Sequence, residues 1–271
     1  MLAVVVASYR QNVHAYPSGG GDYEVVSTNL GPRWGLVVAA ALMVDYTLTV
    51  SVSISSAAQY ASAAVPALRG SETTLAISAV LIIMLINLRG VRESGSFFAI
   101  PVYAFMFSLG TMIVVGFVRY ATGTLPLAAS AQYDVLPTDN FTAGLTGLAG
   151  AYLVLRAFAS GCAALTGVEA ISNGVPSFRP PKSKNAATTL LMLGTIAITF
   201  LMSILILARL TGVRYVADPA TRLLNPDGTP VGEGYHQAPS IGQISEAVFA
   251  GFPIGFYVVT VLTGLILVLA A

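Results

Sequence analysis

Residues 160–173 read SGCAALTGVEAISN and place one carboxylate, Glu169, inside an otherwise apolar stretch. Glycines at 161, 167 and 174 loosen the helix around them. A charged side chain at membrane depth costs roughly 2.5–3.5 kcal/mol on insertion scales and usually serves a function. Interrupted helices are tolerated in membranes only beside protein or a water-filled cavity. The stretch therefore predicts a discontinuous membrane helix at 144–175 with a binding site at its break.

The composition is typical of an integral membrane protein. The 271 residues are 55% hydrophobic and only 9% charged, with a mean hydropathy of +0.78, whereas a soluble domain carries about 25% charged residues. The net charge of +1 gives no indication of a nucleic-acid partner. The single cysteine, Cys162, excludes a disulfide within the chain. His14 and His236 lie in separate polar segments, where we expect them to be solvated; with no cluster at metal-ligand spacing, we expect no cofactor.

Apolar runs predict an all-α membrane fold with five full spans and a partial span at each end of the chain. The five full spans are predicted at 34–65, 73–88, 96–118, 144–175 and 187–208. The apolar residues Met1–Ala7 and the run from Phe249 onward are the partial ones. We therefore expect residues 1–271 to form a single transmembrane domain that is incomplete at both ends, without a soluble domain, as in a fragment of a larger transporter.

Basic residues orient these spans, because short loops rich in Lys and Arg stay in the cytoplasm. The loop at 10–33 and the loops that hold Arg89 and Lys182 are therefore predicted to face inward. Within the first loop, the glycines of PSGGGDY at 17–23 are followed by acids that would repel a phosphate, so we interpret this run as a flexible hinge. The stretch at 240–250 is predicted to be a short amphipathic helix that lies on the outer surface as a gate.

The predicted span at 34–65 carries a second polar set. Asp45, Thr49 and Ser53 are four residues apart and so share one face of a helix, about 6 Å per step. Thr47 is interpreted differently, because hydroxyls in membrane helices commonly bond to the backbone of their own helix. Asp45 needs a cation, a proton or a hydrogen-bond donor at that depth.

Glu169 and Thr166 form the other half of the predicted site. With Gly167 between them, both side-chain oxygens can face one cavity. Oxygen ligands suit hard cations, and rings of carbonyl and hydroxyl oxygens replace the water around a potassium ion. A buried carboxyl is equally suited to proton coupling. A protonated Glu169 that merely bonds a neighbouring helix is the alternative.

Catalysis is not expected from this sequence. An aspartyl protease needs two facing aspartates, and Asp45 is the one aspartate clearly embedded in a span. The HExxH motif of zinc proteases does not occur. Nor does any serine have a histidine at membrane depth to activate it.

Three long motifs resemble a known family. They are SYRQNVHAYPSGGGDYEVVSTNLG at 8–31, DYTLTVSVSISS at 45–56 and SGCAALTGVEAISNGVPSF at 160–178. In this order they closely resemble KimA-type potassium importers of the amino acid–polyamine–organocation (APC) superfamily. Nearly the whole chain is similar to the second to eighth helices of that family's twelve-helix, inverted-repeat (LeuT-like) core.

The resemblance implies potassium uptake coupled to protons across the plasma membrane, in bacteria the cytoplasmic membrane. It implies that Thr49, Ser53, Thr166 and Glu169 line the potassium site, with Asp45 at a further acidic position of the family. It also implies a homodimer in the complete protein, through a cytoplasmic domain that has no counterpart here. The family's first helix, which supplies an aspartate and a tyrosine, also has no counterpart. An amino acid permease on the same fold and a truncated chain that transports nothing are the alternatives.

Overall fold

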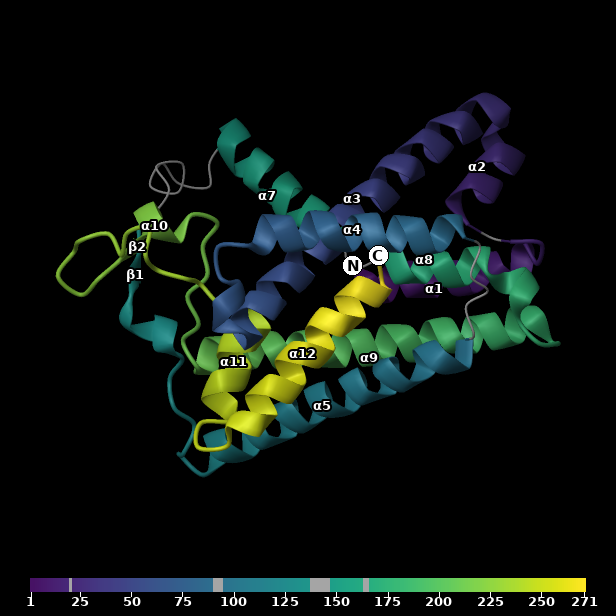
Figure 1. The fold of residues 1–271 in the computed structure, drawn as a ribbon. Helices are drawn as coiled ribbons and strands as arrows, with labels where there is room; N and C mark the ends of the chain where they lie inside the picture. Colours follow the sequence, from purple (N-terminus) through teal and green to yellow (C-terminus); the bar gives the residue numbers. More distant parts are fainter. Residues whose placement is uncertain (20, 90–94, 137–146, 163–165) are drawn as a thin grey trace. The chain divides into compact units, whose positions relative to one another are not determined.

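The computed structural model describes residues 1–19, 21–89, 95–136, 147–162 and 166–271, and this part of the chain is mostly helical (Figure 1). Two short strands within it, β1 and β2, pair antiparallel. The α-helices are α1 Leu2–Ala15, α2 Asp22–Leu30, α3 Pro32–Ala64, α4 Glu72–Leu88, α5 Gly95–Ala121, α7 Gly147–Cys162, α8 Thr166–Asn173, α9 Lys182–Leu210, α10 Pro219–Arg222, α11 Ser240–Val248 and α12 Pro253–Leu269. The strands are β1 Asp134–Val135 and β2 Leu223–Leu224, and the 3-10 helices are η1 Pro66–Leu68, η2 Ala129–Gln132 and η4 Val175–Ser177.

Among the described residues, three helices are long and apolar enough to cross a membrane. They are α3, the Ala99–Ala121 part of α5, and α9. The helices α4 and α12 are apolar but have 17 residues each. Many large apolar side chains on these helices are exposed, as expected for surfaces that face lipid. The predicted all-α membrane fold is thereby confirmed.

The prediction of a loop from residue 10 to residue 33 was wrong. Helix α1 continues past Ala7 to Ala15, and α2 occupies Asp22–Leu30. The apolar side chains of α1 recur at helical spacing beyond Ala7, which lets the helix bury one side along its whole length. Two acids in the first turn of α2 favour that helix, because the N-terminus of a helix carries partial positive charge.

The described chain forms two compact units. Unit 1 comprises Met1–Leu48 and Pro137–Leu201, and unit 2 comprises Thr49–Leu136 and Met202–Ala271.

The core of unit 1 lies between α1, α8 and the start of α9. Figure 1 shows α1 and α8 side by side, and the two helices are in contact. Val13 of α1, Val168 of α8 and Leu190 of α9 are all fully buried in one cluster. Gly194 lets α9 approach α1 closely, since a Cβ there would lie 2.9 Å from a methyl carbon of Val6. Such close contacts stabilise helix packing in membranes, where apolar burial alone gains little.

The core of unit 2 lies where α5, α11 and α12 pack together (Figure 1). The predicted amphipathic stretch at 240–250 is confirmed as α11, whose Ile244 and Val248 are fully buried. Arg119 at the end of α5 anchors it, because its guanidinium donates to the carbonyls of Val248 at 2.7 Å and Ala250 at 3.2 Å. The gating role predicted for this stretch stays a prediction.

Candidate functional site

The predicted discontinuous span at 144–175 contains two helices in the described structure. Helix α7 ends at Cys162 and α8 begins at Thr166, and residues 163–165 between them lie outside the described part. Thr166 is the first residue of α8, but its side chain is also outside the described part. Its predicted role as a potassium ligand therefore stays a prediction.

Glu169 lies in the first turn of α8 and is only 7% exposed. The helix buries Val168 against α1, and this packing holds the neighbouring carboxyl in the interior of unit 1. One turn later, the Asn173 side-chain amide donates to Glu169 Oε1 at 3.4 Å. The Tyr46 hydroxyl of α3 is a second polar neighbour of the same carboxyl.

Two more acids of unit 1 lie close enough to Glu169 to repel its charge. They are Asp22 of α2 and Asp45 of α3. The Tyr9 hydroxyl of α1 donates a hydrogen bond to Asp22 Oδ1. We call these residues the Glu169 cluster: Tyr9, Asp22, Asp45, Tyr46, Glu169 and Asn173.

The Glu169 cluster contains three acids, and its Glu169 carboxyl is not paired with a basic side chain of the described residues. Neutral donors such as an amide and a phenol offset only part of the cost of a buried carboxylate. A proton or a bound cation at Glu169 would offset the remainder. The cluster therefore has the chemistry of a site for a small cation.

The polar ladder predicted on the 34–65 span lies on one continuous helix, α3. Asp45 is exposed, Thr49 is half-buried and Ser53 is only 9% exposed. Asp45 belongs to unit 1, whereas Thr49 and Ser53 belong to unit 2. Thr47 donates to the carbonyl of Met43 at 2.8 Å, which confirms that its hydroxyl bonds to its own helix.

Sequence reasoning missed four members of the Glu169 cluster: Tyr9, Asp22, Tyr46 and Asn173. Asn173 follows Glu169 at i+4, a helical spacing that places two side chains on the same face and could have indicated it. Tyr46 directly follows Asp45, and this adjacency is the only signal for it in the sequence. Asp22 falls in a predicted loop, where its link to Tyr9, 13 positions away, has no sequence signal.

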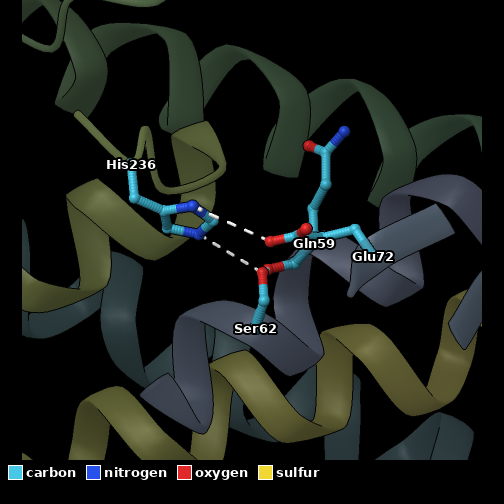
Figure 2. A network of polar contacts seen from close by, with 4 residues as sticks. All are labelled: Gln59, Ser62, Glu72 and His236. Atoms are coloured by element: carbon cyan, nitrogen blue, oxygen red, sulfur yellow. Dashed lines mark hydrogen bonds and ion pairs between the residues drawn. The ribbon is translucent and has the colours of Figure 1, made fainter. Parts of the chain in front are cut away.

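A second polar network lies in unit 2 (Figure 2). His236 Nε2 is 3.3 Å from Ser62 Oγ, and His236 Nδ1 is 3.7 Å from Glu72 Oε1. The Ser62 hydroxyl also donates to the carbonyl of Gln59 at 3.0 Å. We call Gln59, Ser62, Glu72 and His236 the His236 network.

The His236 network corrects one expectation. His236 is paired rather than simply solvated, because Ser62 lies at one of its ring nitrogens and Glu72 at the other. The histidine lies between a serine and a glutamate, as in the catalytic triad of a hydrolase. However, Ser62 is fully buried, and its hydroxyl donates to the carbonyl of Gln59 on its own helix. A nucleophile must reach its substrate, so this arrangement joins segments of the chain and does not present a reactive hydroxyl.

Comparison with known proteins agrees with the resemblance seen in the three motifs. The family model described as amino acid permease matches residues 1–271. The potassium transporter KimA of Bacillus subtilis (strain 168) is 42% identical over 271 residues, which is 100% of this chain and 40% of that protein. The chain thus spans 40% of the length of this curated relative. With its apolar helices, it is part of a multi-pass protein of the plasma membrane, and it belongs to the amino acid permease family.

Proposed function

We propose that the complete protein takes up potassium ions, and that Glu169 is the charged group around which the ion binds. The observation that carries this proposal is the Glu169 cluster: a carboxyl that is 7% exposed, with two further acids near it and no cation paired to it among the described residues of unit 1. The potassium transporter that is 42% identical to this chain supports the choice of ion.

The proposed ligands are oxygens only. Thr49, Ser53 and Thr166 would supply hydroxyl oxygens, and Glu169 would supply the charge. Potassium loses its water shell when such oxygens replace it, and uncharged oxygens select a monovalent ion without holding it too tightly to leave. Asp45 would strengthen the attraction by adding negative charge nearby.

Protons are the proposed coupling ion. The Glu169 cluster holds three acids, so one carboxyl can take up a proton while another attracts the potassium ion. Movement of both ions in the same direction, while the surrounding helices rock about the site, would couple potassium uptake to an inward proton gradient. Glu169→Gln removes this coupling while it keeps the shape of the side chain.

Transport of an amino acid is the second candidate, because the matching family model is described as amino acid permease. Such a substrate carries its own carboxylate, which the permease would bind at helix N-termini and exposed backbone amides. The acids of the Glu169 cluster would repel that carboxylate. The cluster therefore favours a cation over an amino acid.

Uptake by the complete protein in proteoliposomes tests the proposal. We expect rubidium-86, as a tracer for potassium, to accumulate when an inward proton gradient is imposed, and to be displaced by unlabelled potassium. The exposed acid Glu233 offers a matched control, so Glu233→Gln should transport normally while Glu169→Gln does not. Accumulation of labelled amino acids without rubidium uptake would instead establish the second candidate.

A further inference from the structure

Gly21, which directly precedes α2, has a steric role that neither a phosphate loop nor a hinge explains. Gly21 is buried, and a Cβ at this position would lie 1.7 Å from Asn173 Oδ1 and 2.6 Å from Asn173 Cγ. A Cβ at Gly19 would lie 3.6 Å from the backbone oxygen of Asn173. No residue larger than glycine fits at position 21 unless the side chain of Asn173 moves away.

Asn173 uses both ends of its side-chain amide. Its Oδ1 side is pressed against Gly21, and its Nδ2 donates to Glu169 Oε1 at 3.4 Å. Because an amide is planar, a contact that fixes one end also fixes the direction of the other. The backbone at Gly21 therefore determines where the donor to Glu169 points.

The segment that carries Gly21 is itself held in place within unit 1. Gly21 precedes α2 directly, and the first residue of α2, Asp22, accepts a hydrogen bond from Tyr9. Tyr9 lies on α1, which packs against α8. The position of Gly21 relative to α8 is thus tied to the packing of α1.

We infer that Gly21 and Asn173 act as positioning residues: the backbone at Gly21 orients the Asn173 amide toward the Glu169 carboxyl. The inference rests on the proposed function of Glu169. A donor held on one carboxyl oxygen fixes the direction in which the carboxyl points. Any displacement of the Asn173 amide would therefore weaken the attraction of Glu169 for the potassium ion.

A double-mutant cycle in the complete protein tests this inference, with Gly21→Ala, Asn173→Ala and the two together. Each single change removes the Asn173 donor from Glu169, the first by displacing it and the second by deleting it. We expect each to raise the KM for rubidium about three- to tenfold while the maximal rate stays unchanged.

The double variant gives the decisive comparison. If Gly21 acts through Asn173, adding Gly21→Ala to Asn173→Ala does not change the KM for rubidium any further. Additive effects of the two changes would overturn the inference. Gly234→Ala is the matched control, because a Cβ there meets nothing within 4 Å, and it should behave like the unmodified protein.

The cycle substitutes none of the other titratable groups that face Glu169. Among the described residues these groups are Tyr9 of α1, Asp22 of α2, and Asp45 and Tyr46 of α3.

The same cycle separates a folding defect from a positioning defect. If Gly21→Ala prevents folding, Asn173→Ala should restore it by making room, and failure to do so would overturn the inference. Normal uptake by Glu169→Gln would instead refute the proposed function, whatever the cycle shows.

Discussion

Glu169 of unit 1 and Glu72 of unit 2 are two partly or fully buried acids whose neighbours differ in charge. Glu72, whose side chain is 26% exposed, lies 3.7 Å from a histidine that can carry a positive charge. Glu169 is 7% exposed and has an amide and a phenol as donors, with two further acids nearby. Glu169 is thus the more buried of the two carboxyls, and neighbouring groups of the protein offset less of its negative charge.

The difference distinguishes a structural acid from one that is held ready for a ligand. A partly buried carboxylate that pairs with a histidine from a distant segment links the two segments, and its charge is offset without a bound ligand. A more deeply buried carboxylate among like charges raises the energy of the empty site, and a cation that enters lowers it again. On this account Glu169 serves transport, whereas Glu72 and His236 serve the fold.

The largest expected effect comes from neutralising the two acids in turn. Glu169→Gln should lower proton-driven rubidium uptake by about 100-fold, because it removes the charge that attracts the ion. Glu72→Gln should leave uptake within about twofold and reduce stability instead. Initial rates in proteoliposomes that contain equal amounts of folded protein would measure both. Equal losses in the two variants would break the comparison.

A smaller effect is expected from the hydroxyls of α3. Thr49→Ala and Ser53→Ala should each raise the apparent KM for rubidium about three- to tenfold, with little change in maximal rate, because each removes one uncharged ligand. Thr47→Ala is the matched control, since its hydroxyl is engaged by the carbonyl of Met43. A KM for Thr47→Ala that rises as much as the other two would contradict the assigned ligand set.

The smallest effect is expected in the His236 network. His236→Ala should lower the free energy of unfolding by about 0.5–1 kcal/mol, with rubidium uptake unchanged. Thermal unfolding of both proteins would measure this difference. An unchanged free energy of unfolding would show that the network does not stabilise the fold.

The two regions also differ in how far the sequence could predict them. A carboxylate in an apolar run can be seen directly in SGCAALTGVEAISN, so the sequence alone is enough to identify Glu169 as a candidate site residue. The long apolar helices can be predicted for the same reason, since composition and length alone identify them.

Contacts between distant segments could not be predicted in this way. His236 and Ser62 are 174 positions apart, and nothing in the sequence around either residue indicates its partner. The sequence favours a flexible hinge at Gly21 because the identity of a glycine does not reveal what presses against it. Helix α2 escapes prediction because it is short and mostly polar, and the acids in its first turn are equally well interpreted as repelling a phosphate.

The most direct test of the central claim is potassium binding by the complete protein and by its Glu169→Gln variant. Thermal unfolding in detergent, with choline chloride at equal ionic strength as the reference, would report binding as stabilisation. We expect potassium to stabilise the unmodified protein by about 2.7 kcal/mol at 100 times its dissociation constant. The Glu169→Gln variant should gain no stability from potassium. Equal stabilisation of both proteins would contradict the claim that the Glu169 carboxylate holds the ion.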